Sequence, residues 1–248
     1  MRPIGDMARG PAYLWQGFAL IREPGLRSVV ALPLAINVIV IAGLLWLFGS
    51  QWSVWLDAWL AGLPGWLAWL ESVLWWLGFL LAILLFCYFF TLLANLIAGP
   101  FNGILSSRVE RHLTGHEPET GMTLWGEIAD GAVGEARRLL YYAGRALLLG
   151  LLSLVLLFIP VVNALVPILW FAFGAYMLAF EYLDAPMGNR GLPFAIKRRR
   201  LAERRWLGLG FGGTVTLITA LPLINLVVMP AAVAGATALW LAEMEGRE

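Results

Sequence analysis

The chain has 248 residues, of which 60% are hydrophobic and 13% are charged, and its mean hydropathy is +0.79. Because soluble domains carry about 25% charged residues, this composition predicts an integral membrane protein. The formal net charge is +1, and the charges form no basic groove of the kind that binds nucleic acid, so nucleic acid is excluded as an expected partner. The single cysteine, Cys87, excludes an intramolecular disulfide.

The first part of the chain predicts two membrane crossings. Residues 1–27 form an N-terminal amphipathic segment without the compact apolar stretch and cleavage site of a signal peptide. Residues 29–48 and 73–97 are each apolar and long enough to cross a hydrocarbon core of about 30 Å, which takes about 20 helical residues. The Trp-rich connector at 50–72 carries only two charged residues, which favours a segment lying at the membrane interface.

A polar region follows at residues 99–145. Turn residues at Gly99-Pro100 and in "TGHEPETG" flank helical patterns, which predicts a helical hairpin outside the bilayer. Near its start, Arg108, Glu110 and Arg111 are spaced for local ion pairs on a solvated helix face.

Two further apolar blocks, 146–182 and 206–243, repeat one another. A constant offset of 62 residues relates their prolines, asparagines and glutamates: Pro160 and Pro222, Asn163 and Asn225, Glu181 and Glu243. Proline breaks each block, and a first leg of about 14 apolar residues would reach only about 21 Å. Length leaves two alternatives open: a re-entrant helical pair that turns within the bilayer, or an ordinary transmembrane hairpin.

The positions of the basic residues predict the orientation in the membrane. All 17 Lys and Arg residues lie in 1–27 or 108–248. Cytoplasmic segments are enriched in basic residues, so this distribution places both termini and the polar hairpin in the cytoplasm and the Trp-rich connector outside.

No motif for catalysis is present. The sequence has no phosphate-binding P-loop, no HExxH and no Gly-x-Ser-x-Gly, so it predicts neither an enzyme nor a cofactor. His112 and His116 are spaced for a metal on a helix, but Gly115 interrupts that helix and no third ligand is near, so no metal site is expected. Residues 29–56 and 72–97 contain no ionisable Asp, Glu, His, Lys or Arg, which favours channel-like passage over a buried proton relay.

The stretch "EPGLRS" stands directly before the first predicted crossing. Pro24 biases Glu23 away from helix and Gly25 permits unusual backbone geometry, which predicts a helix that starts near Leu26. The N–H groups of such an end, together with the Arg27 guanidinium, form a candidate oxyanion site. The alternative is that the arginine only anchors the helix at the cytoplasmic interface.

Asparagine amides in or beside the apolar stretches are candidates for lining an anion path. The same amides could cap helices or bond between helices. They are Asn37, Asn95, Asn102, Asn163 and Asn225.

Four long stretches carry a resemblance to a known family. "EPGLRSVVALPLAINV", "YFFTLLANLIAGPFNGILSSRVERHLTG", "VPILWFAFGAYMLAFEYLDAP" and "LPLINLVVMPAAVAGATALW" occur in the order typical of the CysZ family of bacterial sulfate permeases. The resemblance covers nearly the whole chain. It implies sulfate uptake across the inner membrane for cysteine biosynthesis.

The same resemblance implies a fold and a site. The fold would be an all-α membrane protein with two long transmembrane helices and two hemi-penetrating helical hairpins, assembled as a homo-oligomer, with a hexamer as the candidate form. Sulfate binding maps onto Gly25, Leu26 and Arg27. Ser28 stands where the family often has a second arginine. The alternative function is a structural or assembly protein of the lipid bilayer that transports nothing.

Overall fold

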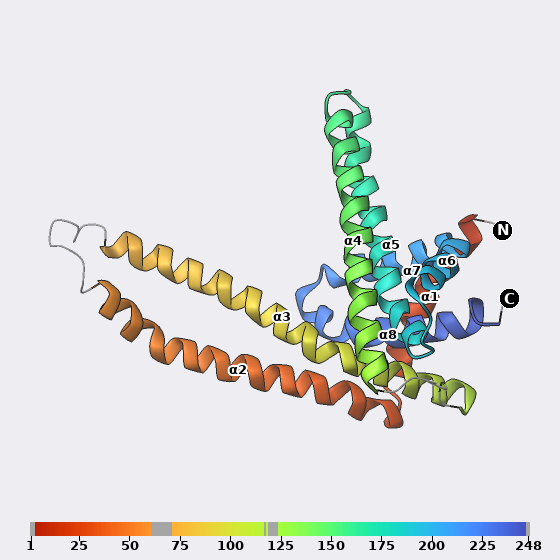
Figure 1. The fold of residues 1–248 in the computed structure, drawn as a ribbon, viewed down its shortest axis with the longest axis horizontal. Helices are drawn as coiled ribbons and strands as arrows, with labels where there is room; N and C mark the ends of the chain where they lie inside the picture. Colours follow the sequence, from red (N-terminus) through yellow and green to blue (C-terminus); the bar gives the residue numbers. More distant parts are fainter. Residues whose placement is uncertain (1–2, 61–70, 117, 119–123, 247–248) are drawn as a thin grey trace. The chain divides into compact units, whose positions relative to one another are not determined.

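The structure is a computed structural model that describes residues 3–60, 71–116, 118 and 124–246. Every regular element in these ranges is a helix, which confirms the all-α prediction (Figure 1). The elements are α1 Pro3–Leu20, α2 Pro24–Leu60, α3 Glu71–Thr114, α4 Leu124–Leu157, the short 3-10 helix η2 Val162–Ala164, α5 Leu165–Gly188, α6 Phe194–Glu203, α7 Arg205–Thr219 and α8 Pro222–Glu243.

The chain divides into two compact units, which are described separately. The first unit, called the core unit here, comprises Met1–Val30 and Asn102–Glu248. The second, the long-helix unit, comprises Ala31–Phe101 and holds most of α2 and the first part of α3. The boundary therefore falls inside two continuous helices.

In the long-helix unit, α2 and α3 pack against each other through aromatic rings. Phe79 on α3 packs edge-on against Trp52 of α2 and stacks on Trp75, with ring centroids 5.6 Å and 5.5 Å apart. Leucine and tryptophan side chains such as Trp46 and Trp76 are exposed instead, at 74% and 66%. An aromatic interior with an apolar exterior is the pattern of a helix pair that faces lipid.

Both long helices exceed the predicted crossings. At 1.5 Å per residue, the 37 residues of α2 and the 44 of α3 reach about 55 Å and 66 Å, well beyond a core of about 30 Å. The helix α2 continues through residues 50–60 of the predicted interfacial connector, and 61–70 lie outside the described residues. The predicted break at Gly99-Pro100 is wrong, because α3 runs through both residues and ends only at Thr114.

The centre of the core unit is α7, packed between α1 and α5, with α8 alongside α1. Glycines permit this close packing. A Cβ at Gly210 would lie 2.0 Å from the Met7 carbonyl oxygen, and one at Gly235 would lie 2.4 Å from that of Tyr13. Because no side chain intervenes, the backbones of α7 and α8 contact that of α1 directly. The N-terminal amphipathic segment is thus part of the protein core.

The two repeated blocks each fold as two helices joined by a turn. Helices α4 and α5 meet at residues 158–164, and α7 and α8 meet at residues 220–221. Two segments in the described chain have the length and hydropathy to cross a membrane, Arg137–Leu157 in α4 and Val162–Gly188, which contains α5. The helix α7 has only 15 residues, about 22 Å, and is too short to cross alone.

Candidate functional site

The candidate anion site lies at the start of α2, which a three-residue turn joins to α1. Because α1 is packed on α7 and α8, the position of the turn that follows α1 is fixed. The backbone N–H groups of Leu26 and Arg27 both donate to the carbonyl oxygen of Glu23, at 2.9 Å and 3.0 Å. The Leu26 side chain is buried, whereas Gly25 and Arg27 are exposed. The buried Leu26 side chain thus anchors the start of α2, while Gly25 and Arg27 face outward.

The side chain of Arg27 folds back over this turn. Its Nε–H donates to the backbone oxygen of Arg22 at 2.6 Å. This bond restrains the guanidinium and leaves its two terminal nitrogens as donors, which is the planar pair that an oxyanion accepts. Ser28 is exposed in the next position.

The structure differs from the sequence analysis in two details of this turn. The helix begins at Pro24, two residues before the predicted start, because proline fits the first helical position, where its missing N–H has no partner to lose. Gly25 is helical and does not have a positive φ. A Cβ at Gly25 would meet no atom within 4 Å, so packing within the protein does not require glycine there. The open space beside it could admit a ligand close to the backbone.

The five candidate asparagines are spread over both units. Asn37 and Asn95 lie in the long-helix unit, and Asn102, Asn163 and Asn225 lie in the core unit. Asn163 is exposed in η2, and its N–H donates to Ile159 O at 3.1 Å. The side chains of Asn37, Asn95 and Asn225 are outside what the structure describes. The core-unit asparagines belong to three different elements, α3, η2 and α8.

A buried charge cluster at the C-terminal end of α8 was not anticipated. Glu243 is 4% exposed and accepts hydrogen bonds from Arg9 and from the Tyr13 hydroxyl, the latter at 3.0 Å. Arg204 lies 3.6 Å from Glu243 and 3.7 Å from Asp6. Burial, followed by the hydrogen bond to Glu243, raises the pKa of Tyr13. The cluster joins α1, the start of α7 and the end of α8.

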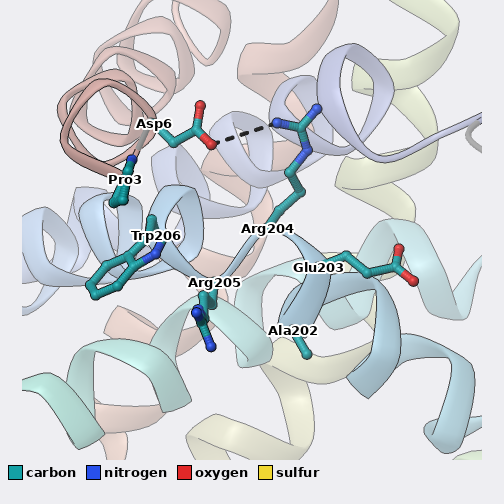
Figure 2. Close-up of a pocket in the computed structure, with 7 residues that line it drawn as sticks. All are labelled: Pro3, Asp6, Ala202, Glu203, Arg204, Arg205 and Trp206. Carbon is teal, nitrogen blue, oxygen red and sulfur yellow. Dashed lines mark ion pairs between the residues drawn. The ribbon is translucent and has the colours of Figure 1, made fainter. Parts of the chain in front are cut away.

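A pocket of about 380 Å³ opens beside this cluster, between the first turn of α1 and the α6–α7 junction. Figure 2 shows Asp6 and Arg204 pointing toward each other, with Trp206 beside Pro3. Its lining includes two acidic residues, Asp6 and Glu203, and two basic ones, Arg204 and Arg205. Its charges are therefore balanced internally.

A second cluster ties α3 to the ends of α5 and α8. Arg190 donates to both carboxylate oxygens of Glu110, at 2.6 Å and 2.9 Å, and also to Glu245. Its guanidinium lies 5.7 Å from the Trp240 ring. Glu110 is 6% exposed, so the expectation of a solvated helix face is wrong for this residue. Burial raises the pKa of the Glu110 carboxyl, and Arg190 opposes that effect.

One signal in the sequence could have located the first cluster. Glu243 ends a nearly continuous apolar run, and a carboxylate in such a position needs a partner. For Glu110 no local signal exists, because Arg190 is 80 residues away in the chain.

Comparison with known proteins identifies the family. Residues 13–230 match the family described as "Sulfate transporter CysZ/Etoposide-induced protein 2.4". The chain belongs to this family. It is 42% identical to the sulfate transporter CysZ of Pseudomonas fluorescens Pf0-1 over 238 residues, covering 94% of this chain and 93% of the relative. The CysZ protein of P. fluorescens Pf-5 is 45% identical, with 94% of each chain covered, and that of P. aeruginosa PAO1 is 41% identical, with 94% and 95% covered.

Proposed function

We propose that this protein carries sulfate into bacteria across the inner membrane, supplying cysteine biosynthesis. The observation that supports this most is the match to sulfate transporters over 94% of the chain. The geometry at the start of α2 is compatible with an oxyanion, because Gly25 has open space beside it and the hydrogen bond of Arg27 uses Nε and leaves the two terminal nitrogens as donors.

The proposed site holds sulfate through the Gly25 N–H and the Arg27 guanidinium, with the Ser28 hydroxyl as a further donor. The Leu26 side chain is buried and its N–H donates to the Glu23 carbonyl oxygen, so this residue positions the turn. A dianion that enters an apolar path loses hydration worth tens of kcal/mol, so polar donors along the route must replace water. The five asparagine amides are the proposed donors.

The remaining features of the proposal concern passage and assembly. Passage is channel-like, because the two long helices carry no Asp, Glu, His, Lys or Arg at 29–56 or 72–97. The α4–α5 and α7–α8 hairpins enter the bilayer as re-entrant pairs within a homo-oligomer, with both termini in the cytoplasm. The 15-residue length of α7 supports this arrangement for the second hairpin.

Sulfate flux tests the proposal directly. Purified protein in liposomes should admit labelled sulfate, whereas a purely structural membrane protein would give no more uptake than empty liposomes. Absence of flux from correctly inserted, oligomeric protein would overturn the transport function.

Titration of sulfate against Arg27 variants tests the site. Arg27→Ala removes a charge-assisted contact worth about 1.5–3 kcal/mol, which is a loss of affinity of about tenfold or more. Arg27→Lys should recover only part of it, because an ammonium group cannot form the planar pair of bonds. Ser28→Arg should tighten binding and make it more sensitive to salt. Unchanged affinity in a well-folded Arg27→Ala protein would exclude this site without excluding transport.

A further inference from the structure

Two arginines that neither charge cluster uses lie on one aromatic ring. The guanidinium carbon of Arg145, on α4, is 4.9 Å from the centroid of the Tyr141 ring, and that of Arg198, on α6, is 5.4 Å from the same centroid. Phe194, at the start of α6, packs edge-on against that ring at 5.8 Å. The ring thus brings two cations from different helices close together.

The charge of this pair is not neutralised within the described part of the chain, where neither guanidinium has an acidic partner. The neighbouring basic residues of α6 differ in this respect. Lys197 binds Asp184 at 2.8 Å, and Arg199 binds Glu203 at 2.9 Å. Both Arg145 and Arg198 are exposed. Two like charges on one ring repel each other, so an anion between them would be stabilising.

An apolar row on α4 continues directly from Arg145. Positions three, seven and ten residues later, which share a helix face, hold Leu148, Leu152 and Val155, exposed at 64%, 47% and 61%. Ten residues of helix rise about 15 Å, which is half of a hydrocarbon core of about 30 Å. The row therefore has the length of one membrane leaflet, with the cations at its head.

From this arrangement we infer that Arg145, Arg198 and Tyr141 form a binding site for the phosphate headgroup of an anionic phospholipid, whose acyl chain lies along the α4 row. Guanidinium groups bind phosphate oxygens in pairs, and tyrosine is enriched at the height of the headgroups. Basic pockets beside membrane helices recognise anionic lipids by the same physics. A soluble anion would use only the cations and would gain nothing from the apolar row. The site is independent of sulfate transport.

The test measures lipid binding to the full-length protein in detergent. After delipidation, phosphatidylglycerol and phosphatidylcholine with identical acyl chains are titrated, and bound lipid is counted by native mass spectrometry. The wild-type protein should prefer phosphatidylglycerol by about tenfold or more. The double variant Arg145→Gln/Arg198→Gln should lose at least about fivefold of that preference. A double variant with the same charge loss, Arg108→Gln/Arg199→Gln, should keep it.

Two further variants separate the parts of the site and guard against misfolding of the glutamine variant. Arg145→Lys/Arg198→Lys keeps both charges but not the planar groups, so it should retain part of the preference. Leu148→Ala/Leu152→Ala should weaken the binding of both lipids while leaving the ratio of their affinities unchanged.

Three results would overturn the inference. An equal loss in the Arg108/Arg199 control would show a general effect of surface charge. Competition by soluble glycerophosphate at concentrations equal to those of the lipid would show a site for soluble anions. A change in the mass of the oligomer without a change in lipid preference would show that this face is a contact between subunits.

Discussion

The two repeated hairpins, α4–α5 and α7–α8, share a sequence pattern but have different surroundings. Only 6% of the membrane-length window in α4 is buried, whereas α7 buries most of its glycine-rich face. At the 62-residue offset, Gly210 and Gly235 correspond to Leu148 and Phe173. Because both glycines lie against the backbone of α1, the larger residues of the first hairpin exclude such a neighbour. Side-chain volume at matched positions thus decides which copy packs closely against α1.

The matched glutamates of the two hairpins also differ in burial. Glu243 is buried among Arg9, Tyr13 and Arg204, while its counterpart Glu181 is exposed. A helix such as α1, packed against the second hairpin, brings cations to its glutamate. Within the described chain, α1 packs against α7 and α8 of the second hairpin, whereas the leucines of α4 in the first hairpin stay exposed.

The largest effect is expected at these glutamates. Glu243→Gln removes the charge that pairs with Arg9 and Arg204 in a buried site, and it should lower the free energy of unfolding by about 3 kcal/mol. Glu181→Gln, at the matched exposed position, should cost at most about 1 kcal/mol. Chemical unfolding of both variants in the same detergent measures the difference. Equal losses of unfolding free energy in the two variants would show that the buried charge cluster does not distinguish the second hairpin from the first.

A matched pair of glycines tests the role of side-chain volume. A Cβ at Gly212 would lie 1.8 Å from the Ala175 backbone oxygen, so Gly212→Ala should destabilise the protein by about 2 kcal/mol. A Cβ at Gly150, 62 residues earlier, would meet no atom within 4 Å. Gly150→Ala should stabilise α4 by up to about 1 kcal/mol, because alanine favours helix. Opposite shifts of the thermal unfolding midpoint are expected, and shifts of the same sign would contradict the comparison.

Arg190, which follows the first hairpin, pairs with Glu245 after the second hairpin and with Glu110 on α3, and its pairing with Glu110 should depend on pH. Burial raises the pKa of Glu110 in the folded protein above its unfolded value. A raised pKa gives stability that is complete below the unfolded pKa and is lost as the pH rises through the folded pKa. The wild-type protein should therefore lose stability relative to Glu110→Gln as the pH rises from about 4 to 7.

Unfolding midpoints measured across that pH range check this prediction. The control is Glu203→Gln on α6, where the carboxylate is half-exposed and pairs with Arg199. That variant should follow the wild-type pH profile. A constant difference between wild type and Glu110→Gln at every pH would contradict the prediction.

The sequence predicts features that depend on local pattern. Hydropathy identifies the helices, and the 62-residue offset identifies the repeat. The start of α2 at Pro24 was also predictable, because proline is favoured at the first helical position. The course of α3 through Gly99-Pro100 was not, since proline inside a helix is tolerated when surrounding groups satisfy the freed backbone oxygen. Pairing of Glu110 with Arg190 depends on tertiary packing, which no local pattern encodes.

The smallest effect is expected at the turn of the first hairpin. Val161 has φ 70°, a conformation that strains a β-branched residue, whereas its counterpart Leu223 lies within α8. Val161→Gly should relieve this strain and raise the free energy of unfolding by about 1 kcal/mol. Val162→Gly, one residue later in η2, where φ is not positive, should instead lower it by a few tenths to about 1 kcal/mol through added backbone entropy in the unfolded chain. Thermal unfolding of the two variants measures the contrast, and destabilisation by both would show that the turns of the two hairpins are equally unstrained.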